Sequence, residues 1–561
     1  MKRLALLIAV FVTLPAAPAT AHAVLESTEP GFNRVLESSP PEVLLRYSEP
    51  VEITFGAVRV FDAEGRRVDT GEARRVAADE IAVGLEPDLP DGTYTVAWRV
   101  LSADSHPLQG GFVFHVGAPG ARAEGIVSEI LPSDEGGVPS WLAAAQRWLS
   151  FASLLVLTGS AGFGILVWAR RGPRGEPAEV FASRWRRLLV AAWAGLVVST
   201  AAGIVIQGAR ATGTGLGDAF SGEVLSGVAG TRFGTVYLLR LGLLAALAFL
   251  WPVIRRHGVW LPRWAAAVGG IGIAALLATP GIAGHAGVAK PVMLNVVADA
   301  VHLEGVALWI GGLVTLLFLA FPATRRASDR VDLLAPVVSG YSRLATAAVA
   351  TLVVAGVYRG WVEVGSVDGL LDTSFGAVLL VKLGVFITVL ALGALSNRHV
   401  RKSINAVTDN ADRGAALSRI KRLVSIEVAV ASVIVGVTAV LVSLPPGRTE
   451  AQAAVFTTSI PLGAANLEVL VDPAEVGENF VHLTATRLSG KPLDIDDVEA
   501  RFSMAAQDIG PIETDGRKLA PGHFVVQGRQ LSLPGTWIIE VVAVVDEVTE
   551  ERARIEVEVE D

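Results

Sequence analysis

Three polar residues near the N-terminus have the types and spacing of a metal site. Asp104 and His106 lie in a Ser-Ala-Asp-Ser-His-Pro segment, and His22 follows a predicted cleavage site. Residues i and i+2 of a strand face the same side, so Asp104 and His106 can converge on one ion. Cleavage before His22 would add its α-amine and imidazole nitrogens. These nitrogen and oxygen donors favour Cu(II), with zinc as the main rival; otherwise Asp104 and His106 are ordinary surface residues.

A second group of polar residues lies inside or beside an apolar segment. Asn295, Asp299, His302 and Trp309 are spaced to share one face of a helix, and His285 precedes them in a Gly-His-Ala-Gly loop. Ionisable groups in membrane spans mark ion pathways or join helices by hydrogen bonds. We interpret His285, Asp299 and His302 as candidates for a membrane pathway, with helix-joining hydrogen bonds as the alternative.

Other polar residues in apolar segments need partners. Glu304 is expected on the helix face opposite Asp299. Lys382 lies at a similar depth in another segment, so a pair between Lys382 and one of these carboxylates is predicted. Arg240 and Gln207 are interpreted either as helix-joining groups or as part of a pathway.

The composition indicates a membrane protein with soluble parts. Of 561 residues, 52% are hydrophobic and only 18% are charged, against about 25% charged in soluble proteins. The formal net charge of −8 argues against a nucleic-acid partner. The absence of cysteine excludes disulfides and thiolate metal sites.

The N-terminus has the pattern of a secretory signal peptide. Lys2 and Arg3 precede an apolar run, and Ala19-Thr20-Ala21 is a small-x-small cleavage pattern. We therefore predict a signal peptide at residues 1–21 and a mature chain that begins with His22. The alternative is an uncleaved anchor helix, for which the apolar run is short.

Hydropathy and turn signals divide the rest of the chain into four parts. Alternating strand patterns predict β domains at residues 22–117 and 446–561, and residues 118–140 form a Gly-, Pro- and acid-rich linker. Residues 141–444 contain eight apolar segments, each long enough to span a bilayer as a helix. We place these spans near 142–168, 187–207, 234–254, 260–282, 292–321, 341–361, 376–396 and 423–444.

Basic residues predict how the spans are oriented. The loops after the first, third, fifth and seventh spans are rich in Arg and Lys. The alternate loops hold few basic residues, namely Arg210, Arg232, Lys290 and Arg359. The positive-inside rule therefore predicts a multi-pass plasma-membrane protein with both soluble domains outside the cytoplasm. A cleaved signal peptide requires the same orientation.

Residues 22–117 resemble the CopC family of secreted copper-binding proteins. The resemblance rests on Tyr47-Ser48-Glu49-Pro50, Gly92–Arg99, the Asp-x-His-Pro segment and Gly110–Phe114. It implies an immunoglobulin-like β-sandwich that binds Cu(II) through His22, Asp104 and His106, with Glu49 as a weaker ligand. The methionine-rich Cu(I) site of some members is missing from this sequence. His115 lies outside the pattern and is expected to be a surface histidine.

The remaining parts resemble two further families. Residues 141–444 resemble the CopD membrane proteins in Gly284–Gly287, Asp299-x-x-His302 and Trp309–Leu313, which implies an eight-helix bundle involved in copper uptake. The C-terminal part resembles the YtkA-like domain, another immunoglobulin-like module, in Leu519–Phe524 and Leu533–Trp537. His482, His523 and Met504 are further residues there that could contact copper, although single histidines on a β domain are usually surface residues.

Together these features predict copper handling rather than enzymatic activity. The outer domain would capture Cu(II), and the bundle would move copper across the plasma membrane, inward as the resemblance to the uptake family implies. The sequence has neither a P-loop nor an Asp-Lys-Thr-Gly phosphorylation segment, so no nucleotide partner is expected. Two alternatives stay open: a b-type haem membrane protein using membrane histidines, and a copper-responsive sensor or scaffold.

Overall fold

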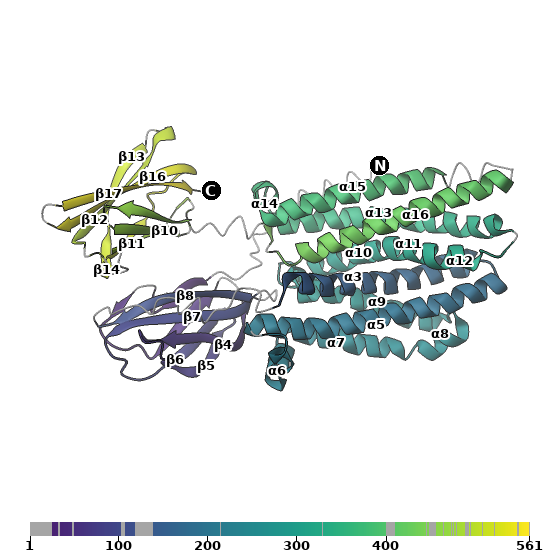
Figure 1. Cartoon of the computed structure of the whole chain (residues 1–561), viewed down its shortest axis with the longest axis horizontal. Coiled ribbons are helices and arrows are strands. Elements are labelled where there is room, and N and C mark those ends of the chain that lie inside the picture. The colour runs from purple at the N-terminus through teal and green to yellow at the C-terminus, as the bar shows by residue number, and fades with distance from the viewer. Residues whose placement is uncertain are drawn as a thin grey trace. The chain divides into compact units, whose positions relative to one another are not determined.

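The computed structural model describes most of the chain in three parts. The described residues are 25–31, 34–47, 50–102, 107–117, 138–213, 215–327, 329–399, 410–444, 446–447, 456–463, 465–472, 474, 476–477, 479–487, 493, 495–507, 509–520, 522–546 and 549–559. The first part is a β domain, the second is helical and the third is another β domain (Figure 1).

The N-terminal β domain contains two four-stranded sheets, in the orders β1-β3-β6-β5 and β2-β8-β7-β4. Alternating side chains of β3 are buried, as expected for a strand with one face on a core. The strands are β1 (Leu25–Glu29), β2 (Val35–Leu36), β3 (Glu42–Tyr47), β4 (Val51–Phe61), β5 (Asp69–Ala77), β6 (Glu80–Leu85), β7 (Gly92–Ser102) and β8 (Pro107–Val116).

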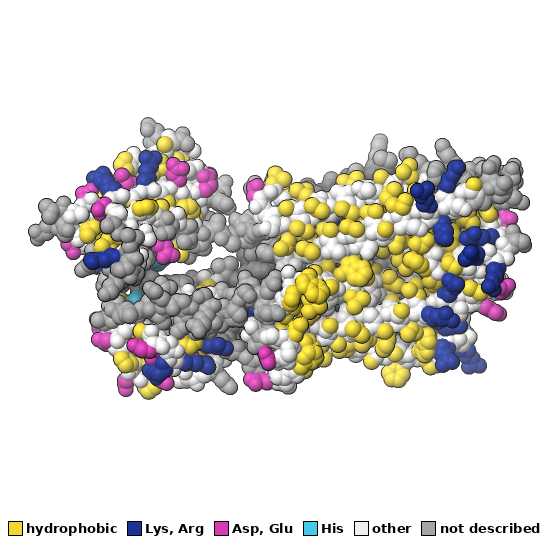
Figure 2. All heavy atoms as spheres, in the orientation of Figure 1, with side chains coloured by type: hydrophobic (Ala, Val, Ile, Leu, Met, Phe, Trp, Pro, Cys, Tyr) yellow, Lys and Arg dark blue, Asp and Glu magenta, His cyan; other side chains and the backbone are white. Residues whose placement is uncertain are grey.

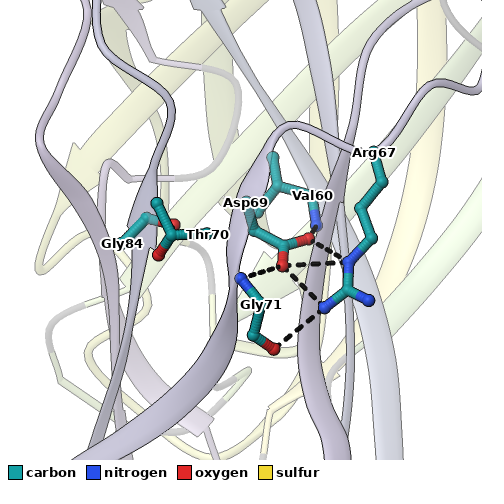
Figure 3. A network of polar contacts seen from close by, with 6 residues as sticks. All are labelled: Val60, Arg67, Asp69, Thr70, Gly71 and Gly84. Carbon is teal, nitrogen blue, oxygen red and sulfur yellow. Dashed lines mark hydrogen bonds and ion pairs between the residues drawn. The ribbon is translucent and has the colours of Figure 1, made fainter.

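A buried carboxylate fixes the passage from β4 to β5, which belong to different sheets (Figure 3). Asp69 accepts hydrogen bonds from the backbone N–H groups of Val60 (2.9 Å) and Gly71 (3.0 Å). Arg67 binds both carboxylate oxygens of Asp69 and also donates to the Gly71 carbonyl. Gly71 has a φ of +111°, which a side chain would disfavour. Asp69 therefore accepts hydrogen bonds from one backbone donor on β4, one on β5 and the Arg67 guanidinium between them.

Eight helices in the second part are long and apolar enough to cross a membrane. All eight predicted spans coincide with these helices. They comprise α3 (Ser140–Gly162) with η1 (Phe163–Trp168) and α4 (Ala169–Arg171); α5 (Glu176–Thr212); α7 (Arg232–Ala248) with α8 (Trp251–His257); α9 (Arg263–Ala283); α10 (Val292–Val306) with η4 (Ala307–Gly311), α11 (Gly312–Thr315), η5 (Leu316–Ala320) and α12 (Phe321–Ala323); α13 (Arg330–Val364); α15 (Ser374–His399); and α16 (Asn410–Leu441).

Short elements connect these helices. They are η2 (Asp218–Phe220), α6 (Gly222–Gly230), η3 (His285–Gly287) and α14 (Asp368–Leu371). Large apolar side chains are exposed on the outside of the bundle, for example Ile271 (71%) and Ile387 (64%). Figure 2 shows apolar side chains over the visible face of the bundle and Lys and Arg gathered at the end where α8 and α12 lie. This pattern suits a bilayer better than water.

Glycines bring two central helices into backbone contact. A Cβ atom on Gly159 of α3 would collide with the Ala307 carbonyl, and one on Gly311 of η4 would collide with the Leu155 carbonyl. Small residues at such crossings allow the close packing that holds membrane helices together. The π-helical turn η4 lies at this crossing, and Tyr341 of α13 donates a hydrogen bond to the Trp309 carbonyl there.

The C-terminal β domain contains sheets in the orders β14-β15-β11-β10-β9 and β13-β12-β16-β17. Buried residues of both sheets form one core, which includes Trp537, Phe502 and Phe524. The strands are β9 (Phe456–Leu462), β10 (Ala465–Asp472), β11 (Asn479–Arg487), β12 (Asp497–Met504), β13 (Ile509–Asp515), β14 (Arg517–Ala520), β15 (His523–Gly528), β16 (Gly535–Asp546) and β17 (Thr549–Val559), and η7 (Ala505–Gln507) follows β12.

The Asp69 network predicts a large stability effect from one substitution. Asp69→Ala should lower the free energy of unfolding of residues 22–117 by about 2–4 kcal/mol, because it leaves buried backbone donors without an acceptor. Arg74→Ala is the control, since Arg74 pairs with Glu42 on the surface and should cost about 1 kcal/mol or less. Chemical denaturation measures both, and equal losses would contradict the role given to Asp69.

Candidate functional site

The predicted N-terminal ligands His22, Glu49, Asp104 and His106 lie outside the described residues. The described strand ends beside them can be placed. Leu25 at the start of β1 is opposite Tyr47 at the end of β3, and Tyr47 packs edge-on against Trp98 of β7, with ring centres 5.7 Å apart.

A polar interface between α10 and α13 contains the predicted pathway residues that lie within a span. Asn295 of α10 accepts a hydrogen bond from the Tyr358 hydroxyl (2.8 Å). One turn further along α10, Asp299 lies 3.7 Å from Arg359 of α13. His302 packs beside Gly356 of the same helix. The expected common face of Asn295, Asp299 and His302 is therefore the face of α10 that contacts α13.

Arg359 joins two carboxylates in this interface. Besides the contact of its Nε with Asp299, its Nη2 atom binds Glu363 one turn along α13. The second terminal nitrogen, Nη1, and Oε2 of Glu363 are enclosed, without a hydrogen-bond partner in the described part of the chain. Buried polar atoms of this kind are uncommon and leave capacity for a further ligand.

Glycines set the space around Asp299 and His302. A Cβ atom at Gly281 of α9 would lie 2.8 Å from Oδ2 of Asp299. One at Gly356 of α13 would lie 3.1 Å from Cε1 and 3.3 Å from Nδ1 of His302. The Nδ1 atom of His302 is enclosed and has no hydrogen-bond partner among the described residues. Both candidate side chains thus fit closely against glycines of the neighbouring helices, and a larger residue there would press on them.

His285 lies in the turn η3 between α9 and α10. Two hydrogen bonds hold this connection: Asn295 donates to the Ala289 carbonyl (2.8 Å), and Arg232 donates to the Ile282 carbonyl. Asn295 therefore links the His285 loop to the same interface that contains Asp299. Among the residues that the structure describes, no three His, Asp or Glu side chains are grouped closely enough to hold a metal ion.

The structure adds to two expectations about the bundle and agrees with a third. Among the described side chains, Arg359 lies at ion-pair distance from Asp299 (3.7 Å). The predicted partner Lys382 also interacts electrostatically with Asp299, without a close ion pair among the described contacts. Trp309 was expected on the same helix face as Asp299 and His302. It lies in the π-helical turn η4, whose wider turn changes the helix register after His302. Its ring packs edge-on against that of Phe386, with ring centres 5.9 Å apart. Glu304 faces away, as expected, and lines an apolar pocket of about 550 Å³ with Trp185 and Trp193, among others.

Arg240 and His115 have clear packing roles. Arg240 of α7 donates to Thr279 of α9 (2.8 Å) and to Ser150 of α3 (3.5 Å), so it joins three helices. His115 is buried against Thr93 (3.0 Å), so the expectation of a surface histidine is wrong. It fills space on β8, which pairs with β2.

Sequence reasoning missed Arg359 and Glu363 as site residues. From the sequence, Arg359 stands out only as one of the few basic residues in the loops predicted to lie outside the cytoplasm. Glu363 follows it by one helical turn. Their i, i+4 spacing on α13 was the available signal, because oppositely charged residues at this spacing contact each other.

Three family descriptions match the chain in separate parts. The CopC domain matches residues 25–117. The N-terminal domain of copper resistance protein D-like proteins matches residues 138–293, and copper resistance protein D matches residues 335–441.

Several characterised proteins are similar. Copper transport protein CutJ of Bacillus subtilis (strain 168) is 28% identical over 482 residues, which cover 84% of this chain and 83% of CutJ. Copper resistance protein C of Escherichia coli is 30% identical over 107 residues, 18% of this chain and 83% of that protein. Copper resistance protein D of Pseudomonas syringae pv. tomato is 25% identical over 308 residues, 54% of this chain and 97% of that protein.

The close packing of Asp299 against α9 can be tested with two glycines of the same helix. Gly281→Ala should destabilise the detergent-solubilised protein by about 1–3 kcal/mol, because its Cβ would press on the Asp299 carboxylate. Gly270→Ala meets no atom within 4 Å and should be neutral or stabilising by up to about 1 kcal/mol. Thermal unfolding measures both, and equal melting temperatures for the two variants would contradict the packing.

Proposed function

This chain belongs to the CopC and CopD family of copper resistance and transport proteins, and from that premise we propose that it captures Cu(II) outside the cytoplasm and moves copper inward. The N-terminal domain binds the ion, and the helical bundle carries it across the plasma membrane. The names of the similar proteins describe transport and resistance rather than an enzymatic reaction, which agrees with the expectation that this chain is not an enzyme.

The ligands proposed for Cu(II) capture are His22, Asp104 and His106, with Glu49 as a weaker contributor. The described strand ends support this assignment. His22 precedes β1 and Glu49 follows β3, and the register pairs Leu25 with Tyr47, so both residues continue from the same end of the β1–β3 pair. Residues 103–106 connect the adjacent strands β7 and β8. The ligands can share one ion if the β7–β8 connection lies near this end of the β1–β3 pair, and the contact between Tyr47 at the end of β3 and Trp98 of β7 supports that arrangement.

The orientation follows from charge. The loops rich in Arg and Lys are at the end of the bundle that contains α8 and α12 (Figure 2). The positive-inside rule assigns this end to the cytoplasm. The His285 turn, Asp299 and Arg359 then lie toward the outer end, where an arriving copper ion would enter.

The observation that carries the membrane part of the proposal is the Asp299–Arg359–Glu363 arrangement. Arg359 supplies a positive charge that Asp299 and Glu363 share within the span. A copper ion can replace that charge if Arg359 withdraws from Asp299, which it contacts at a loose 3.7 Å. His302, one turn after Asp299 on α10, then offers an imidazole ligand, and copper accepts both imidazole and carboxylate donors. His285, in the turn η3 before α10, is proposed as a separate contact that an arriving ion meets first.

The remaining assignments belong to the same proposal. We assign a signal peptide to residues 1–21, a CopC-like domain to 22–117, a linker to 118–140, a CopD-like domain to 141–444 and a YtkA-like domain to 446–561. Both β domains are interpreted as immunoglobulin-like sandwiches, because each contains two β-sheets. The strand pairs with a described register are antiparallel, apart from the short β2–β8 pair.

Cu(II) capture can be tested on residues 22–117 with a native His22 N-terminus. We expect one equivalent of Cu(II) with a nitrogen-rich tetragonal electron paramagnetic resonance spectrum. Asp104→Ala, His106→Ala or one extra residue before His22 should each weaken binding at least tenfold, whereas His115→Asn should not, because His115 is buried beside Thr93. Binding that is indifferent to all of the ligand changes would contradict the site.

The membrane pathway can be tested in cells that depend on this protein for copper accumulation. Asp299→Asn and His302→Ala should reduce the initial rate of copper accumulation at least tenfold. Glu304→Gln is a matched control, because it removes a carboxylate from the same helix on the face that lines the apolar pocket. Copper and immunoblot measurements correct each rate for protein amount. Lower cell copper on expression of the unmodified chain would contradict inward movement.

A further inference from the structure

Two histidines face each other on the C-terminal β domain. His482 of β11 and His523 of β15 approach to 3.4 Å between Nδ1 and Nε2. Their ring planes are inclined by only 10°, with ring centres 5.6 Å apart. The lone pairs of imidazole nitrogens lie in the ring plane, and the facing Nδ1 and Nε2 atoms bring two of them to the same space between the strands.

The sheet register fixes this arrangement. His482 is opposite Val525, and Thr484 is opposite His523, so the histidines are diagonal neighbours on adjacent antiparallel strands. Leu483 and Phe524, which alternate with them, belong to the domain core. The two imidazoles therefore share the outer face of their sheet. Met504 belongs to the core instead, so it does not join them.

The nitrogen–nitrogen distance fits a shared metal ion. Imidazole nitrogens bind such ions at about 2.0–2.1 Å. A nitrogen separation of 3.4 Å then corresponds to an angle of about 110° at the ion, which is close to tetrahedral. Adjacent ligands of tetragonal Cu(II) subtend about 90° and lie closer together. The spacing thus favours an ion without a tetragonal preference, such as Cu(I) or Zn(II).

Charge also suits a cation. Glu468 of β10 is exposed on the same face, opposite Thr484 and diagonal to His482. A carboxylate at this position attracts a cation without a requirement for direct ligation.

We propose that His482 and His523 form a second metal site, which takes Cu(I). The choice of copper over zinc rests on the proposed function of this chain. The two-imidazole geometry is independent of that function. The described residues provide no third His, Asp or Glu close enough to complete a larger group, so water or an incoming donor fills the other positions. Two protein ligands and open positions make an ion exchangeable, as transfer between sites requires.

The test uses the full chain in detergent with Asp104→Ala and His106→Ala, which remove the first proposed site. Cu(I) is titrated without oxygen in competition with bathocuproine disulfonate. We expect His482→Ala and His523→Ala each to remove one bound equivalent or weaken it at least tenfold. Val525→Ala, opposite His482 on the same outer face, should leave binding unchanged.

Two further measurements separate the outcomes. His482→Asn and His523→Asn, checked for an unchanged thermal transition, repeat the titration in a domain that remains folded. Unchanged Cu(I) binding in these variants overturns the site, and retention of Zn(II) without Cu(I) overturns its assignment to copper. Because the first site is absent from every variant here, failure of Cu(II) capture at His22 would be detected separately in residues 22–117.

Discussion

An arginine between two carboxylates is the electrostatic constraint on which the membrane part depends. A charged group within a bilayer costs several kcal/mol unless it is paired or hydrated. Arg359 reduces this cost for Asp299 on α10 and for Glu363 on its own helix. The pairing also fixes the rotation of α10 against α13, because Asn295 and Tyr358 must meet one turn away. The polar face of α10 is consequently held toward α13, and its other face, with Glu304, is left to apolar neighbours.

This constraint has a consequence for ion movement. Two unpaired carboxylates in a membrane would retain a metal ion tightly, whereas carboxylates that already share the charge of Arg359 bind the ion in exchange for that contact. Arg359 contacts Glu363 closely and Asp299 loosely, so Asp299 is the carboxylate that can change partner at lower cost. Glycines at 281 and 356 keep the space beside Asp299 and His302 narrow. An ion that entered there would therefore meet donors rather than a water-filled cavity.

The sequence was sufficient where one physical property dominated. Apolar length alone predicted every span, since a bilayer requires about twenty apolar residues and a helix satisfies its own backbone. Helical spacing also placed Asn295, Asp299 and His302 on one face. The pairing of Asp299 could not be predicted in this way, because Lys382 and Arg359 lie at similar depths and helix packing decides between them. The register change at Trp309 came from a π-helical turn, which no residue type specifies. The burial of His115 was not predicted, because its contact partner Thr93 is distant in sequence. The ligand residues His22, Glu49, Asp104 and His106 remain predictions, supported by the strand ends around them.

The two metal sites proposed for the β domains differ in a way that follows from their ligands. An N-terminal amine, imidazoles and a carboxylate in tetragonal arrangement favour Cu(II). A diagonal pair of imidazoles across two antiparallel strands offers only two nitrogens, which lie 3.4 Å apart, so it does not provide that arrangement. If both sites hold copper, the chain binds it in two oxidation states at its two β domains, and an electron donor must act on the ion between them. The sequence has no cysteine, so no thiol of this chain is that donor.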